Sequence, residues 1–142
     1  MNYDSDLLIL EDDKDHLIEA IYQSQVYQNY LAAYQAFQQD LGAQQQKERF
    51  LLAKQRFDAI APYGAYAPDY KKYQRELRKE KRALDMIPSV IELRASEYEL
   101  QQLYDCVAET IAQSVSDHIN VISGQPFLKR QCQGGCQHGA SI

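Results

Sequence analysis

Apolar and aromatic side chains recur every three or four residues along most of this chain, which is the spacing of an amphipathic helix. The longest such pattern starts at Pro88 and continues to about Ile122, interrupted only by Glu97. Proline suits the first turn of a helix, and neither glycine nor proline follows before Gly124. We therefore predict a helix of roughly 30 residues, about 45 Å long. Its apolar stripe must pack on shorter helices of the same chain, on a second copy or on another protein.

Four shorter helices are predicted upstream. Ser24 suits the cap between the first two, because its hydroxyl accepts a hydrogen bond from a free backbone amide. Gly42 is expected to end the second helix in the left-handed conformation. No alternation is long enough for a strand, so the sequence predicts an all-α antiparallel bundle of about five helices. The first short helix precedes Ser24 and has its apolar positions at Leu17, Ile18, Ile21 and Tyr22. The second, at about 25–40, has them at Val26, Tyr30, Ala33, Tyr34 and Phe37. The third, at about 44–60, has them at Phe50, Ala53, Phe57 and Ile60, and the fourth, at about 69–84, at Tyr70, Tyr73, Leu77 and Leu84.

A sharp corner separates the last two of these helices. Two prolines and Gly64 lie between residues 61 and 70 and favour a compact turn, over which three nearby tyrosines are expected to pack. Such a corner joins antiparallel helices. Around this framework we expect an acidic flexible lead at 1–12, a helical domain at 13–122 and a flexible tail at 123–142.

Composition narrows the class of protein. With 142 residues the chain is long enough for one domain with a real core, and its 45% hydrophobic and 25% charged residues are ordinary for a globular protein. The net charge of -5 argues against coating of nucleic acid or anionic membranes by the whole surface. Seven carboxylates and one lysine among the first 19 residues do not resemble a secretory signal. No apolar run approaches the length of a membrane span, so a cytoplasmic location is expected.

The helix predicted at 69–84 is strongly basic, with seven cations against Glu76 and Glu80. These cations could follow a phosphate backbone, with nearby tyrosines stacking on bases, in a small RNA-binding protein. The favoured alternative is a solvated or partner-docking face, along which Lys72 pairs with Glu76 and Arg82 with Glu80. The candidate residues for RNA or partner docking are Arg75, Arg78, Lys79 and Arg82.

The tail holds the candidate metal ligands. Cys132 and Cys136 enclose two glycines, which allow both thiolates to turn toward one ion, and His138 follows. Three ligands are too few for a closed zinc site or a cubane cluster, so a fourth is needed from Cys106, a second copy or a partner. The alternatives are an unligated tail, a reversible disulfide, or a zinc-stabilised structural module. Cys106 itself lies mid-helix, where a small buried hydrophobe is the expected role.

Catalysis has little support in the sequence. His16 stands among carboxylates at a helix start, where solvated charge explains it better than acid–base chemistry. His118 falls on the apolar stripe and is expected to be a packed or interface residue. No serine or cysteine has a recognisable nucleophile setting. The tyrosines are expected to serve the core and protein interfaces, because they combine apolar area with a polar tip.

Several segments together resemble the YlbF/YmcA family of bacterial regulatory proteins. They are Tyr63-Gly64-x-Tyr66-x-Pro68-Asp69-Tyr70, the basic helix ending in Leu84-Asp85, Ala95-x-Glu97-x-Glu99-Leu100-Gln101, and Cys132-Gln133-Gly134-Gly135-Cys136, which is similar to the YlbF branch. The resemblance covers roughly residues 13 to 136. It implies an all-helical, non-enzymatic regulator that tends to dimerise.

By the same resemblance, the protein would join YmcA-like and YaaT-like proteins in a complex that carries iron–sulfur clusters. Such a complex assists RNase Y in maturing messenger RNA and promotes competence, sporulation and biofilm formation. A cluster shared with partners would use Cys132 and Cys136. We expect the partner interface at Tyr66, Tyr70, Tyr73, Leu100, Tyr104, Val107 and Ile111.

Overall fold

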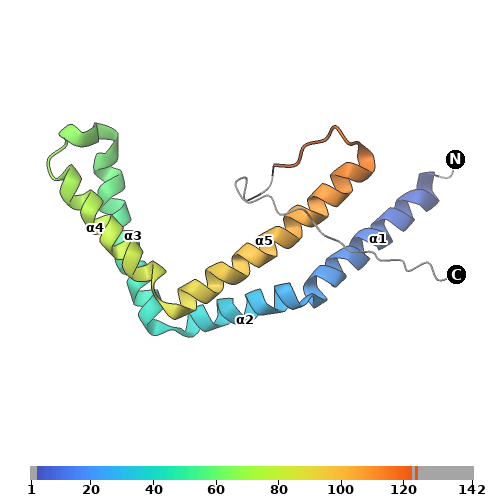
Figure 1. Ribbon diagram of the computed structural model, residues 1–142, viewed down its shortest axis with the longest axis horizontal. Helices are drawn as coiled ribbons and strands as arrows, with labels where there is room; N and C mark the ends of the chain where they lie inside the picture. Colours follow the sequence, from blue (N-terminus) through green and yellow to red (C-terminus); the bar gives the residue numbers. More distant parts are fainter. Residues whose placement is uncertain (1–2, 123, 125–142) are drawn as a thin grey trace, which may run out of the picture. The chain divides into compact units, whose positions relative to one another are not determined.

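The computed structural model describes residues 3–122 and Gly124 (Figure 1). In this part the chain is all-α, as predicted, and contains no strand. No helix among these residues is long and apolar enough to cross a membrane. The elements are α1 (Tyr3–Gln23), α2 (Gln25–Gln39), α3 (Leu41–Ile60), the 3-10 helix η1 (Ala61–Tyr66), α4 (Tyr70–Asp85) and α5 (Pro88–Val115). The chain divides into two compact units, Met1–Tyr98 and Glu99–Ile142.

Helices α3 and α4 lie side by side as a hairpin in the first unit (Figure 1). Ala53 is buried on α3, and the rings of Phe57 and Tyr70 meet with their centroids 5.3 Å apart. The hairpin turns through η1, where Gly64 has a φ of 65°. That angle suits glycine because a side chain would be strained there. The predicted corner and the apolar stripe of the third predicted helix are confirmed.

The core of the first unit gathers where α2, α3, α4 and the start of α5 meet. Ala43, Leu84 and Val90 are buried, and Phe37, Phe50 and Ile87 pack against them. Ala43 has no exposed surface, and its small side chain fits where helices approach closely. Residues distant in sequence therefore share one apolar cluster.

Asp40 joins three of these helices. Its backbone is extended, so it ends α2 and also caps α3, where its Oδ1 accepts a hydrogen bond from the Ala43 amide at 3.0 Å. Its Oδ2 accepts a hydrogen bond from the Ser89 hydroxyl of α5 at 2.7 Å. The hydrogen bond from Ser89, followed by the one from the Ala43 amide, lowers the pKa of the Asp40 carboxyl.

The turn between α2 and α3 differs from the prediction for Gly42. This glycine lies inside α3 and is not left-handed, because Asp40 already changes the chain direction with an extended backbone. A Cβ at position 42 would lie 3.3 Å from Asp40 Oδ1, so glycine leaves room for the capping carboxylate. The Ser24 cap is confirmed: its hydroxyl oxygen accepts a hydrogen bond from the Tyr27 amide at 3.2 Å.

Two helix boundaries also differ. Helix α1 begins at Tyr3, so the loose lead expected up to residue 12 is wrong for the described residues. No glycine or proline interrupts this segment, and carboxylates such as Asp6 suit the positive end of a helix. Helix α5 ends at Val115, not near Ile122. There the Ser116 hydroxyl accepts a hydrogen bond from the His118 amide at 3.2 Å, a local turn that competes with the helix.

Truncating the core leucine tests this packing. Leu84→Ala should lower the free energy of unfolding by about 2–5 kcal/mol, because it leaves a cavity between helices. Leu52→Ala, at a side chain that is 55% exposed, should change it by less than about 0.5 kcal/mol. Urea titrations followed by circular dichroism would measure both. Equal losses would contradict a core centred on Leu84.

Asp40 also predicts a pH dependence. Its folded pKa lies below the ordinary value of 3.8, so the carboxylate stabilises the fold fully above that pH and loses its effect as the pH falls through the folded pKa. Asp40→Asn should therefore lower the melting temperature at pH 7, and its difference from the unsubstituted protein should shrink in acid. Thermal melts between pH 7 and pH 2.5 would show this. A difference independent of pH would contradict the role of the charge.

Candidate interaction surfaces

The tip of the α3–α4 hairpin presents aromatic side chains to water. Tyr63 is 73% exposed and Tyr66 is fully exposed, so the expectation that three tyrosines pack over the corner is wrong for these two. Gly64, which lies between these two tyrosines, has non-helical backbone angles, with φ 65° and ψ -165°, and interrupts the helical course of the segment. Only Tyr70 of the three packs inward, against Phe57. Asp69, just before α4, also has a positive φ, of 62°.

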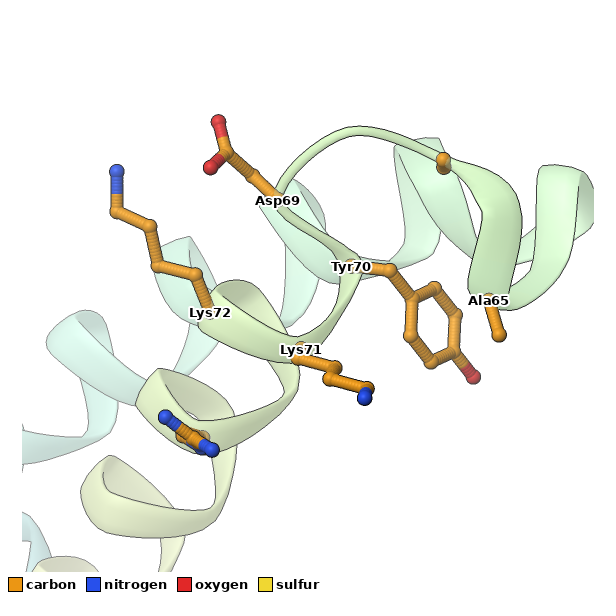
Figure 2. Close-up of a pocket in the computed structure, with 7 residues that line it drawn as sticks. Ala65, Asp69, Tyr70, Lys71 and Lys72 are labelled. Atoms are coloured by element: carbon orange, nitrogen blue, oxygen red, sulfur yellow. The ribbon is translucent and has the colours of Figure 1, made fainter.

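A shallow pocket lies beside this tip (Figure 2). The Tyr70 ring points toward Ala65, whereas the side chains of Asp69 and Lys72 point away from it. Three cationic residues and one acidic residue thus line the pocket with Tyr70. The lining residues are Ala65, Ala67, Asp69, Tyr70, Lys71, Lys72 and Arg75.

Glu76 and Glu80 of α4 are bound by α3 and not by their own helix, whereas Asp85 is paired with Arg94 of α5. Arg56 forms an ion pair with Glu76 at 2.9 Å, and the Gln46 amide donates to Glu80 Oε2 at 2.7 Å. The predicted pairs Lys72–Glu76 and Arg82–Glu80 are not formed, because the neighbouring helix supplies the partners. Among the described residues, no cation of α4 lies within ion-pair distance of a carboxylate.

The four α4 residues predicted as candidates for docking all lie on the exposed surface of this helix. Tyr73, by contrast, is half-buried, with the Lys72 ammonium 5.7 Å from its ring centroid. Of the three tyrosines expected at a partner interface in the first unit, Tyr66 is thus accessible, Tyr70 packs on Phe57 of the hairpin, and Tyr73 is half-buried. The exposed residues of the docking set are Arg75, Arg78, Lys79 and Arg82.

Helix α1 extends the predicted apolar face of Leu17 and Ile18 toward the N-terminus, into a segment that was expected to be loose. Leu7 and Leu10 are 56% and 65% exposed, and Leu17 and Ile18 continue the same stripe at helical spacing. A row of tyrosine rings follows across the junction with α2. Its successive centroids, from Tyr22 through Tyr27 and Tyr30 to Tyr34, lie 5.0, 6.4 and 6.1 Å apart. The four consecutive apolar residues from Leu7 to Leu10 are the local signal for this face, and the acidic composition around them masks it.

In the second unit, the later part of α5 mixes buried and exposed positions. Leu100 is buried, Val107 is half-buried, and Tyr104 and Ile111 are exposed. Asp105 fixes the chain after the helix, because its carboxylate accepts a hydrogen bond from the Gly124 amide at 3.1 Å. Tyr104 and Ile111 are therefore accessible as expected for an interface, whereas Leu100 is not.

The metal ligands expected from the sequence lie largely outside the described residues. Cys132, Cys136 and His138 are all beyond them. Cys106 is half-buried in α5. Within the described residues, no group of three or more histidine, cysteine or acidic side chains is arranged to hold a metal ion. The described part of the chain therefore does not supply a cluster site by itself.

The two described histidines do not form a reactive group with neighbouring side chains. His16 is exposed on α1, as expected for solvated charge. His118 is also exposed, which corrects its predicted place on a buried stripe, because α5 ends before it. The described carboxyl with a lowered pKa, Asp40, is engaged in capping.

Comparison with known proteins decides the family. A family model described as "Control of competence regulator ComK, YlbF/YmcA" matches residues 10–116. The chain belongs to the YlbF/YmcA family. Regulatory protein YlbF of Bacillus subtilis strain 168 is 34% identical over 134 residues, which cover 93% of this chain and 90% of that protein.

A solved structure agrees with this YlbF/YmcA assignment. A chain in the crystal structure of Bacillus subtilis RicA in complex with RicF is similar with a TM-score of 0.73 and 32% identity, over 80% of this chain and 98% of that chain. The YlbF/YmcA resemblance read from the sequence is thus confirmed. The similar structure is a complex of two proteins, and the present chain exposes an apolar face on α1.

Proposed function

We propose that this YlbF/YmcA family protein is a non-enzymatic regulatory adaptor that acts by assembling with other helical proteins. The apolar face of α1 carries this proposal. Leu7, Leu10 and Leu17 are exposed along a helix of 21 residues, roughly 30 Å long. Such a face gains stability when it is covered by a matching helix.

The tyrosine row next to α1 extends the surface available to a partner. Tyrosine is enriched in protein interfaces, because its ring buries apolar area and its hydroxyl keeps a polar contact. Tyr22 and Tyr34 at the two ends of the row are exposed. A partner helix lying along α1 could continue onto these rings.

The comparisons support assembly with a partner protein. The similar crystal structure contains RicA in complex with RicF, and the similar curated protein is a regulatory protein. The partners proposed here, as the family resemblance implies, are YmcA-like and YaaT-like proteins and RNase Y. The proposed process is RNase Y-dependent maturation of messenger RNA, with competence, sporulation and biofilm formation downstream.

Charge substitutions on α1 test the adaptor surface. Leu10→Lys together with Leu17→Lys should abolish co-purification of partner proteins, because buried ammonium groups without a counter-charge are costly at an interface. Ile9→Lys is the matched control: this side chain is 59% exposed on the same helix. It lies off the stripe, about 100° around the helix from Leu10.

The measurement is an affinity purification of the tagged protein from its own cells, with mass spectrometry of the bound proteins. Recovery of YmcA-like, YaaT-like or RNase Y proteins with the unsubstituted chain and the Ile9→Lys variant, but not with the double variant, supports the adaptor. Recovery of none of these proteins in any sample would refute the proposed partners.

The proposal also includes an iron–sulfur cluster that the tail cysteines share with a partner. Cys132→Ser with Cys136→Ser should leave the helical content unchanged and weaken the purified complex, if their thiolates complete a shared iron–sulfur cluster. Circular dichroism, together with the iron content of complexes purified without oxygen, would measure both effects. Equal iron content and equal assembly in the variant would remove the cluster from the proposal.

A further inference from the structure

The basic side of α4 and the tip of its hairpin form one continuous surface. Lys71, Arg75, Arg78 and Arg82 follow one another at intervals of three or four residues, so they lie along a single line of the helix. The apolar residues Leu77 and Leu84 lie on the other side, toward the hairpin and the core. The line of four cations runs over 12 residues, from Lys71 to Arg82, about 16 Å along the helix.

The hairpin keeps this charge available. None of these four cations stands three or four residues from Glu76 or Glu80, and α3 binds both of these carboxylates through Arg56 and Gln46. Asp85, three residues after Arg82, is paired with Arg94 of α5 at 2.8 Å. The cationic groups are therefore left to water or to an external anion. At Asp85 this arrangement depends on the tertiary contact, since the helix alone would place that carboxylate beside Arg82.

The tip adds exposed aromatic rings at the start of the same line. Tyr66 is fully exposed and contributes no packing to the fold. The local backbone is held by hydrogen bonds from the Ala67 amide to the Gly64 carbonyl at 3.1 Å and from the Tyr70 amide to the Ala67 carbonyl at 3.2 Å. A ring presented on an ordered turn loses little freedom when it stacks on a ligand.

We propose that this surface binds single-stranded RNA, with the α4 cations on successive phosphates and Tyr66 stacked on a base. Proteins that bind single strands combine a line of positive charge with aromatic stacking platforms, and both lie within this one hairpin. An acidic protein segment would also satisfy the cations, and the test below includes it as an outcome that contradicts the proposal. The inference goes beyond the adaptor function and does not depend on α1.

The test is fluorescence anisotropy of a labelled 20-nucleotide single-stranded RNA of mixed, unpaired sequence, titrated with the full chain over a series of salt concentrations. Arg75→Gln with Arg78→Gln should weaken binding about 25-fold at 0.1 M salt and reduce the salt slope by about 1.4, since each phosphate contact to a single strand contributes about 0.7 to that slope. Arg49→Gln with Lys54→Gln removes the same charge from exposed positions of α3 and should have little effect.

A second variant separates stacking from charge. Tyr66→Ala should weaken binding about tenfold without changing the salt slope, because it removes a base contact and no cation. This side chain touches nothing that holds the fold, so circular dichroism should be unchanged.

Three results would overturn the proposal. They are no binding by the unsubstituted chain, equal losses in the α4 and α3 double variants, and displacement of the RNA by poly-glutamate as effectively as by unlabelled RNA of equal charge. The last result would indicate an acidic protein segment as the occupant. Because these assays contain no partner protein, their outcome is independent of the α1 substitutions.

Discussion

The Asp40 carboxylate is the contact on which the arrangement of the first unit depends. One oxygen caps α3 and the other binds Ser89 at the start of α5, while the extended backbone of the same residue ends α2. A capping side chain usually serves one helix, but Asp40 also fixes where a helix almost 50 residues later begins. The apolar cluster of Ala43, Leu84 and Val90 forms next to it.

The hairpin extends from this junction and shows how packing changes surface charge. When α3 packs on α4, it brings Arg56 and Gln46 to the two carboxylates within the basic helix. The contacts are modest in strength because Arg56 is well exposed. The positive side of α4 lies on a different face from these two carboxylates, and Asp85 is paired with Arg94, so that side is left without internal counter-charges among the described residues.

The α1 face and the basic side of α4 use different physical chemistry. The α1 face offers apolar and aromatic area, which suits a helix of another protein and gives binding that depends little on salt. The α4 side offers charge with an exposed ring, which suits an anionic strand and gives binding that salt weakens. A regulator that carries both surfaces on one chain could bind a protein partner and a nucleic acid at the same time.

The helical class and much of the element order follow from the sequence, because apolar spacing, the Ser24 cap and the corner at Gly64 are properties of short segments. Membership of the YlbF/YmcA family is also readable from local motifs. Two further features also had local signals. The turn at Ser116 marks the end of α5, but the longer apolar pattern favoured a helix to Ile122. The apolar run at Leu7 marks the face of α1, but the acidic composition around it favoured a loose segment.

Only the tertiary structure decided which charges remain free and which tyrosines face water. Glu76 and Glu80 have plausible partners on their own helix, and the register of α3 against α4 supplies others. Tyr63, Tyr66 and Tyr70 look alike in sequence, yet the backbone turn exposes the first two and packs the third on Phe57. Asp40 reads as a simple helix stop until Ser89 is placed beside it. Such pairings depend on distances between segments far apart in the chain, and those distances are set by packing, not by local spacing.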